Sequence, residues 1–431
     1  MIQALRTAFG LPDLRRKMLF TFLILVVYRL AAHVPIPNVD SQALARLFQR
    51  SQFLGFLDLL SGGAMSTFSV IAMGVYPYIT ASIIIQLLIP LIPQLKSLAE
   101  EGEAGRRKIE QYTCWLTIPL SFLQAFGQAS LLQSQGVITN FGLSGPTLLP
   151  TLATIITLTA GTMFAIWLGQ LITEQGIGNG LSLIIFGGIV ARIPQNVGAL
   201  VVGNVKGLVV FLLITAVTVA VIIFVQEGQR RIPVQFGRRV VAMRGRRLSV
   251  RGGQRTHIPL LVNSAGMIPL IFAQSILIFP ATIASYLLSA QPDWLARMAN
   301  SVYRSFNTTS NFYWILYFLT VVGFTYFYAD IIFEEQNLAD ALKRQGGFIP
   351  GIRPGRRTAD YLRGVLRRIT LVGAIFLGAV ALLPWLARGI TKTGTMVITS
   401  AGLLIVVGVA LDTIRQLEAQ LLMRRYKGFI K

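Results

Sequence analysis

The sequence predicts an all-α integral membrane protein with ten transmembrane helices. Three observations support this fold class: a hydrophobic share of 54% with a mean hydropathy of +0.64, a series of apolar runs of membrane-spanning length, and an uneven distribution of Lys and Arg among the connecting segments. A soluble chain of 431 residues does not tolerate so much apolar surface. The chain is therefore expected in a lipid bilayer.

Ten apolar stretches are long enough to cross the hydrocarbon core of about 30 Å, which takes about 20 helical residues. The first and fifth have the weakest signals, because Arg29 lies late in one and Arg192-Ile193-Pro194 ends the other. The sixth and tenth are the clearest. The predicted spans are 18–34, 72–92, 112–132, 150–172, 177–193, 207–226, 262–286, 312–332, 369–387 and 395–414.

The basic residues predict how the spans are oriented. With the amino terminus inside, the cytoplasmic segments hold 30 of the 39 Lys and Arg residues; these segments are 1–17, 93–111, 173–176, 227–261, 333–368 and 415–431. This bias follows the positive-inside rule. We expect a multi-pass protein with both termini in the cytoplasm, whose first span is retained because no small-residue cleavage site follows it.

Groups that carry chemistry are sparse inside the predicted spans. All 17 acidic residues lie outside the span centres, and His33 and His257 both flank spans. Ion-coupled transporters normally place a carboxylate or histidine near the midplane. No nucleophile–base pair, metal-spaced pair or phosphate loop can be assembled, and Gly176–Gly180 reads as a tight inter-helix turn. We therefore expect no enzymatic activity, no cofactor and no metal, and the single Cys114 excludes an intramolecular disulfide.

The segment 53–71, after the first span, does not read as an ordinary loop. It is too apolar for an exposed loop, yet Gly62-Gly63 breaks it too strongly for a spanning helix. Irregular backbone at membrane depth is tolerated only where protein or a water-filled cavity covers it. A re-entrant segment beneath an outward-facing cavity fits this pattern, and an interfacial hairpin on the outer leaflet is the alternative.

Four motifs together closely resemble the SecY family of protein-translocation channels, and the resemblance extends over essentially the whole chain. They occur in family order within the ten-span layout: YPYITASIIIQLL at 76–88, GIGNG at 176–180, VNSAGMIP at 262–269 and FIPGIRPG at 348–355.

The resemblance implies two pseudo-symmetric, inverted five-helix halves around an hourglass pore. The halves would be 18–205 and 206–414, between a cytoplasmic amino-terminal segment (1–17) and a cytoplasmic tail (415–431), with loops at 227–261 and 333–368. A short helix at about 57–70 would plug the outer funnel. Its central residues would be Leu59, Leu60, Ser61, Gly62, Gly63, Ala64, Met65 and Ser66.

At the waist of the pore, the resemblance implies a ring of aliphatic side chains: Ile79, Ile83, Leu181, Ile185, Ile271 and Ile405. Leu181 departs from the isoleucine more usual in bacterial members. Such a constriction dewets and blocks ions without gripping a passing chain. The family also opens a lateral gate between spans 2 and 7, backed by spans 3 and 8, for which the candidate residues are Thr80, Ser82, Gln86, Gln274 and Ser275.

Nine arginines lie between residues 230 and 255, with Glu227 as the one nearby acid. Such a cluster suits RNA phosphates or anionic lipid, and a purely orienting role remains open. The resemblance implies binding of the SecA motor and the ribosome at the two long cytoplasmic loops, and of SecE and SecG as small membrane subunits. The residues implied are Arg244, Arg246, Arg247, Arg353, Arg356 and Arg357.

The functional hypothesis is a protein-conducting channel of the bacterial inner membrane. It would recognise signal sequences, translocate unfolded preproteins and release transmembrane segments sideways into lipid, with the energy supplied by a motor or ribosome. A small-solute transporter with inverted repeats and a pore-free ribosome- or RNA-anchoring scaffold are the competing classes. A scaffold accounts for the arginines but not for the plug.

Overall fold

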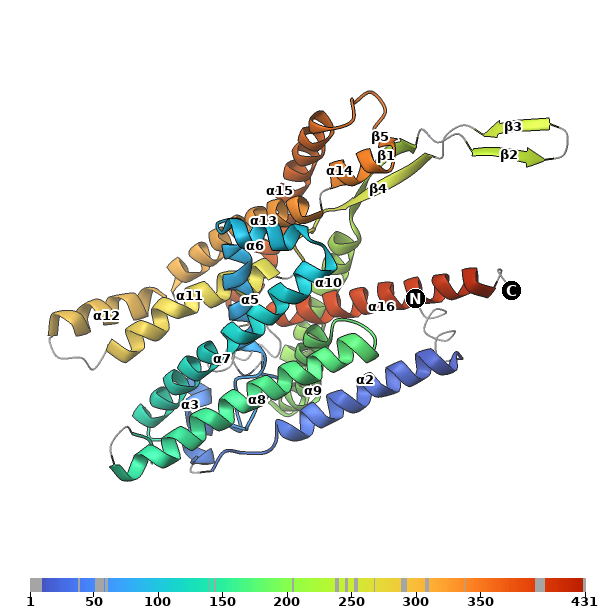
Figure 1. Cartoon of the computed structure of the whole chain (residues 1–431). Coiled ribbons are helices and arrows are strands. Elements are labelled where there is room, and N and C mark those ends of the chain that lie inside the picture. Colours follow the sequence, from blue (N-terminus) through green and yellow to red (C-terminus); the bar gives the residue numbers. More distant parts are fainter. Residues whose placement is uncertain are drawn as a thin grey trace. The chain divides into compact units, whose positions relative to one another are not determined.

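The chain folds into two compact units, coloured along the sequence in Figure 1. Unit 1 comprises 1–210, 281–303 and 393–431, and unit 2 comprises 211–280 and 304–392. The computed structural model describes residues 10–37, 39–50, 58, 61–138, 140–142, 145–203, 205–236, 240–244, 247–251, 255–266, 268–287, 293–306, 310–336, 338–391 and 400–428.

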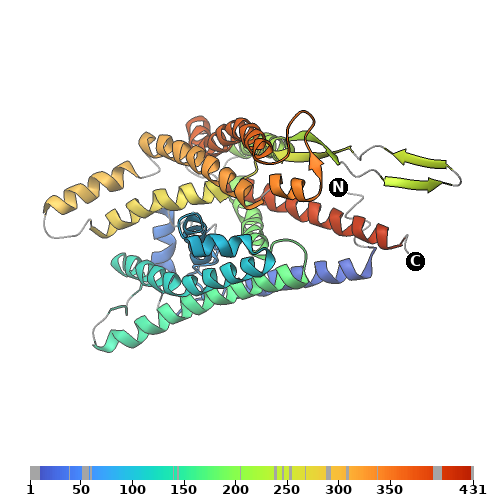
Figure 2. The same ribbon diagram turned by 45° about the horizontal axis from the view of Figure 1, so that its top comes forward.

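Unit 1 is built from helices. α5, α7, α8 and α9 pack against one another in that order, α2 lies against α8 and α9, and α16 lies against α9 (Figures 1 and 2). The elements are α2 (Pro12–Ala31), α3 (Ser41–Arg50), α5 (Tyr76–Leu88), α6 (Pro93–Glu100), α7 (Glu103–Ser134), η1 (Gly145–Thr147), α8 (Leu148–Gln175), α9 (Gly180–Gly203), most of α12 (Asp293–Ser305) and α16 (Ser400–Gly428).

Several helices continue beyond the apolar run that predicted them. α2 begins at Pro12, six residues before the predicted span, because proline suits a first helical position and Asp13 complements the positive helix end. The added turn buries Leu14 against Ile177 and Leu417. Hydropathy alone misses such extensions, since they pack against protein outside the hydrocarbon layer.

The second predicted span, 72–92, is bent. α5 ends at Leu88, and the chain turns by 104° into α6 at Pro93. Pro90 and Pro93 explain the break, because proline lacks the N–H that would continue the helix and restricts the residue before it. The predicted turn at Gly176–Gly180 is confirmed between α8 and α9, where Gly178 adopts φ +93°.

Unit 2 combines helices with β-structure. α13 packs along α15, and α14 contacts α15 (Figure 2). Its elements are most of α10 (Val205–Glu227), β1 (Gln229–Phe236), β2 (Val240–Arg244), β3 (Arg247–Arg251), β4 (Arg255–Leu261), most of α11 (Ile268–Leu287), α13 (Asn311–Gln336), α14 (Leu338–Arg344), β5 (Gly347–Phe348) and α15 (Arg356–Thr391).

The expected loop 227–261 is an antiparallel ribbon. β1 lies between β4 and β5, and Ile232 of β1 pairs with Ile258 of β4. The inward face of the ribbon packs on helices, in a core made of Ile232, Val234, Leu260, Phe333, Leu342, Ile349, Leu362 and Leu366. The period-two pattern of Arg231-Ile232-Pro233-Val234, exposed and buried in alternation, is the strand signal that the arginines obscured.

Each of the ten predicted spans overlaps a helix of the structure. By length and composition, three stretches of the described chain can cross a membrane, namely Gly145–Gln175, Asn311–Arg344 and Arg356–Leu383, and the bent pair Tyr76–Leu88 with Pro93–Ala99 would be a fourth. Shorter apolar helices lie at Gly180–Pro194, Leu212–Glu227 and Ile268–Leu277.

We predict that Leu362→Ala loosens the ribbon from α15. Leu362 is fully buried in the core of unit 2, and truncating such a leucine costs about 2 to 5 kcal/mol. Limited proteolysis within 229–261 of the detergent-solubilised protein should become faster. Leu371→Ala, at a half-exposed position of the same helix, is the matched control and should leave proteolysis unchanged; equal rates in the two variants would contradict the assigned packing.

Candidate functional site

The predicted waist residues of unit 1 lie on three helices. Ile79 and Ile83, four residues apart, share one face of α5, and Ile83 is buried. Leu181 and Ile185 share one face of α9 in the same way, and Ile185 is buried. Ile405 is buried on α16, which packs against α9. The remaining member of the predicted ring is the buried Ile271, on the part of α11 that belongs to unit 2.

A glycine of α8 determines how Leu181 sits. The Leu181 side chain packs so closely over Gly169 that a Cβ added there would lie 2.8 Å from Leu181 Cδ2. The start of α9 is fixed by Asn179, whose side-chain oxygen accepts the Ser182 N–H at 3.2 Å. Residue 181 is therefore oriented by the GIGNG turn.

The predicted plug is not a regular helix in the described residues. Residues 61–75, here called the plug segment, form consecutive turns. Gly62 and Gly63 adopt φ +67° and +95°, and Phe68 adopts φ +43°. Positive φ interrupts an α-helix, and for the buried Phe68 it costs about 1 to 2 kcal/mol that its packing must offset. Leu59 and Leu60 lie outside the described residues.

Backbone hydrogen bonds join the plug segment to the chain after α2. Ile36 N–H donates to Phe68 O, and Val70 N–H donates to Val34 O, both at 3.0 Å. Thr67 Oγ1 donates to Ala32 O at 3.0 Å. These bonds satisfy polar backbone that would otherwise be stranded at membrane depth.

Asp58, three residues before Ser61, organises the start of the plug segment. Its carboxylate is fully buried, and Oδ1 accepts the Ser66 N–H at 2.7 Å. Its carbonyl accepts the Gly63 N–H at 2.8 Å and the Ser61 hydroxyl at 3.1 Å. The charge of Asp58 meets Arg192 of α9 in an ion pair.

Two arginines and a tyrosine hold the same stretch from outside. Arg29 of α2 donates to Gly62 O. Tyr28 OH donates to Ser61 O at 3.0 Å. Arg192 also donates to the Ser66 hydroxyl. Two helices thus contribute one guanidinium each to a single turn of the plug segment.

Glycines bring the plug segment into backbone contact with α9 and α8. A Cβ built on Gly62 would lie 2.7 Å from Gly188 Cα, and one built on Gly161 would collide with Val70 O. Neither approach leaves room for a side chain. The segment therefore sits against the helices without intervening atoms.

Sequence reasoning missed this polar cluster. Along the sequence, Arg29 and Arg192 lie near the ends of predicted spans, and Asp58 lies within an apolar stretch. A signal existed, because Asp58 is an isolated acid within residues 53–71, and a carboxylate in such surroundings is rarely buried without a partner.

The predicted gate residues are polar but locally satisfied or buried. Thr80 and Ser275 donate to carbonyls of their own helices, at 3.1 and 2.9 Å. Ser82 and Gln86 are half-buried on α5. The buried Oε1 of Gln274 has no hydrogen-bond partner among the described residues. The sequence analysis missed two further glutamines of this kind, Gln124 and Gln128 on α7, the helix packed against α5.

The basic candidates lie on two connecting structures of unit 2. Arg244 of β2 is the register partner of Arg247 of β3, and Arg246 lies outside the described residues. Arg353, Arg356 and Arg357 are exposed at the start of α15. There Gly351 and Gly355 adopt φ +84° and +113°, and Thr358 Oγ1 donates to Arg353 O at 2.9 Å. The turn before α15 therefore holds Arg353 on the surface.

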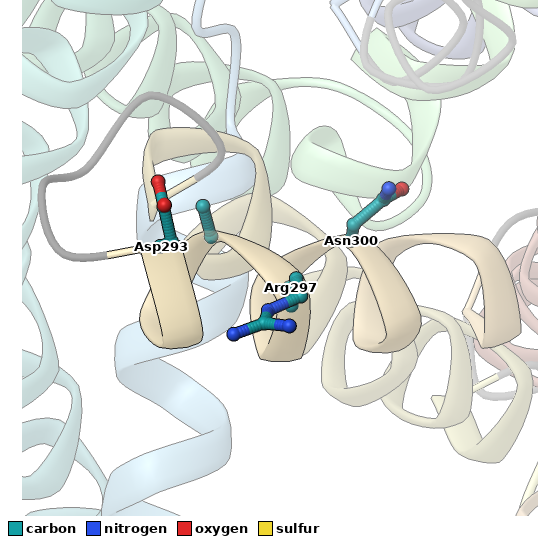
Figure 3. A pocket seen from close by; sticks show the side chains of 4 residues that line it. Asp293, Arg297 and Asn300 are labelled. Carbon is teal, nitrogen blue, oxygen red and sulfur yellow. The ribbon is translucent and has the colours of Figure 1, made fainter.

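A surface hollow of about 420 Å³ lies beside α12. It is lined by Asp293, Ala296, Arg297 and Asn300. Figure 3 shows the three polar side chains spaced along one exposed helix, without convergence on a common point. This arrangement does not resemble a substrate site.

Comparison with known proteins identifies the family to which the chain belongs. A model of the SecY family matches residues 69–414. The chain belongs to the SecY family. Protein translocase subunits SecY of Halalkalibacterium halodurans and Thermotoga maritima are 44% and 42% identical to it, covering all of this chain and 100% and 98% of theirs. The subunit of Mycobacterium tuberculosis is 43% identical over the full chain and 99% of its own length.

Solved structures share the SecY fold at low sequence identity. One, described as a protein conducting channel, matches with a TM-score of 0.63 at 17% identity and covers 94% of this chain and 91% of its own. Sec61 in the canine ribosome-channel complex matches with a TM-score of 0.58 at 15% identity and the same coverage. The chain is thus a multi-pass membrane protein with the SecY fold.

Three of the four SecY-family motifs fall at junctions between elements, and the first is the whole of α5. The second is the α8–α9 turn, the third joins β4 to α11, and the fourth joins β5 to α15. Turns require particular residues at particular backbone angles. The motifs therefore position the helices that carry the candidate waist and gate residues.

Proposed function

We propose that this SecY-family chain is the pore-forming subunit of a protein translocase in the bacterial plasma membrane. Unfolded preproteins pass through it, and transmembrane segments leave it sideways into lipid. The observation that carries the proposal is the buried, irregular plug segment, because such backbone at membrane depth needs a protein-lined cavity. The relatives named as protein translocase subunits support the same activity.

The waist residues form the seal in this proposal. The proposed seal is made of six aliphatic side chains that exclude water and ions by dewetting, namely Ile79, Ile83, Leu181, Ile185, Ile271 and Ile405. Branched hydrocarbon side chains offer no hydrogen bond to a passing polypeptide, so a substrate of any sequence can slide through the seal. The buried state of four of them is what a closed seal requires.

The plug segment closes the outer side in the resting state. Its backbone contacts with α8 and α9 at Gly161 and Gly188 supply close packing, while its hydrogen bonds to residues 32–36 can be replaced by water when it moves. The proposed lateral gate consists of Thr80, Ser82 and Gln86 on α5 and of Gln274 and Ser275 on α11. Interhelical hydrogen bonds in membranes contribute only about 0.6 to 2 kcal/mol, so the gate can part repeatedly.

Energy comes from partners in this proposal, and the chain itself is a conduit without enzymatic activity. Exposed Arg353, Arg356 and Arg357, together with the arginines of the β1–β4 ribbon, form the surface for a SecA motor or for ribosomal RNA. Guanidinium groups pair with both carboxylates and phosphates. SecE and SecG complete the complex in the membrane, anionic lipid contacts the ribbon, and both termini lie in the cytoplasm.

We predict that the plug segment moves during transport. Ala64→Cys, in a Cys114→Ser background, should resist a membrane-impermeant thiol reagent at rest, because Ala64 is fully buried. Trapping a preprotein in the pore should make it reactive. Thr67→Cys is the control, since Thr67 is exposed in the same segment and should react in both states. Equal labelling of Ala64→Cys with and without substrate would favour a fixed hairpin and a scaffold function.

We predict that Ile83→Asn and Ile185→Asn hydrate the waist. Burying an isoleucine contributes about 2 kcal/mol, so losing it should raise resting ion conductance by about tenfold or more. Export of a preprotein with a defective signal sequence should also rise. Ile156→Asn, at a half-exposed position of α8, is the control. Unchanged conductance and signal stringency in the two buried variants would remove these residues from the seal.

We predict that Arg353→Glu blocks motor- or ribosome-dependent transport. Placing like charges together at an interface costs several kcal/mol, about 10²-fold or more in affinity. Membrane insertion and detergent solubility should be unchanged, because Arg353 is exposed on a turn. Lys343→Glu, an equal change of charge at an exposed position of α14, is the control. Normal translocation by the Arg353→Glu variant would mean that the charge of this loop only orients the chain in the membrane.

A further inference from the structure

The polar cluster around Asp58 suggests how the plug segment is held. We propose that Arg192 and Arg29 act as positioning residues that latch the plug segment through Asp58 and the carbonyls of Gly62 and Gly63, and so set how often the channel opens at rest. The proposal rests on the proposed function of residues 61–75 as a plug. It assigns a role to three charged residues that the seal and the gate do not use.

The first argument is the burial of the Asp58 charge. The Asp58 side chain is fully buried. Among the described residues, its Oδ2 has no hydrogen-bond partner, and its charge is balanced by the ion pair with Arg192. A buried carboxylate without a compensating charge is strongly unfavourable. Arg192 is therefore the group that allows Asp58 to remain ionised in the seated position.

The second argument is that the contacts converge on one turn. Arg192 donates to Ser66 Oγ and, at 3.5 Å, to Gly63 O, while Arg29 donates to Gly62 O. The two guanidiniums come from α9 and α2, which pack together. Movement of the turn would break all of these contacts at once.

The third argument is the partial exposure of Arg192. Its side chain is 27% exposed, against 1% for Asp58. Water can therefore replace the contacts of Arg192 as the turn begins to move, which weakens an ion pair. A Cβ built on Gly63 would lie 2.8 Å from Arg192 Nε and 3.1 Å from Arg29 Nη1, so the two guanidiniums border the same glycine. Arg192 and Arg29 repel each other more strongly once Asp58 has left. The arrangement holds the plug segment at rest and still permits release.

The latch differs from steric packing in its dependence on charge. The Gly62–Gly188 contact is unaffected by neutralising Asp58, and asparagine keeps an oxygen to accept the Ser66 N–H. Asp58→Asn thus removes the charge while conserving the shape. Arg192→Lys conserves the charge and loses the forked geometry, whereas Arg192→Met loses both.

The experiment measures resting ion conductance in proteoliposomes and thiol labelling of Ala64→Cys in the Cys114→Ser background. Asp58→Asn and Arg192→Met should each raise both by about tenfold, since each leaves a charge without its partner. Arg192→Lys should restore most of the resting seal. The double variant should leak no more than the leakier single variant, because both changes remove one interaction.

Controls separate the latch from a loss of folding. Glu334→Gln breaks the exposed ion pair of Glu334 with Arg363, 2.9 Å apart, and should leave both measurements at the parental level. Each variant is checked by gel filtration in detergent. If Arg192→Met proves unstable, Asp58→Asn and Arg192→Lys still decide the question.

The outcomes distinguish the latch from the plug itself. Deleting residues 61–70 should open a conductance if these residues are a plug. Parental conductance and labelling in Asp58→Asn and Arg192→Met, combined with a leaky deletion, would overturn the latch and leave the plug in place. A deletion without conductance would overturn the plug and the latch with it. Strictly additive effects in the double variant would also contradict the latch.

Discussion

Irregular backbone that lipid cannot solvate needs hydrogen-bond partners from protein or from water in a cavity, and the arrangement of unit 1 follows from that constraint. Residues 61–75 cannot use a helical ladder, because Gly62, Gly63 and Phe68 adopt positive φ. Their polar groups bond instead to residues 32–36, to Tyr28 and Arg29 of α2, and to Arg192 of α9. α2 and α9 thus serve as partners of a segment that lipid could not solvate.

The plug segment is held both by close packing and by charge. Gly161 and Gly188 let α8 and α9 approach the plug segment at backbone distance, which excludes water. Asp58 and Arg192 then add a contact that depends on water being excluded, since an ion pair strengthens as its surroundings dry. A segment held in this way can be firmly seated and still be released when water or a substrate enters.

Unit 2 presents a different chemistry on its β-structure. A ribbon of β1 and β4 packs its apolar face on α15 through Leu362 and Leu366, so that the opposite face of β1 carries exposed residues such as Arg231. A β-ribbon fixes alternate residues on opposite faces. It therefore presents charge at a defined place, which a loose loop could not do.

The sequence by itself determined the membrane fold class, the approximate places of ten helices, the turn at Gly176–Gly180 and, through four motifs, the family. These features depend on local composition and on turn residues, which can be read along the chain. Tertiary structure decided where α2 and α16 extend beyond their apolar runs, that residues 61–75 are turns, and that 227–261 is a ribbon. It alone brought Asp58 to Arg192, which are 134 positions apart. Pairing of distant charges depends on how helices pack, and no local pattern in one sequence records it.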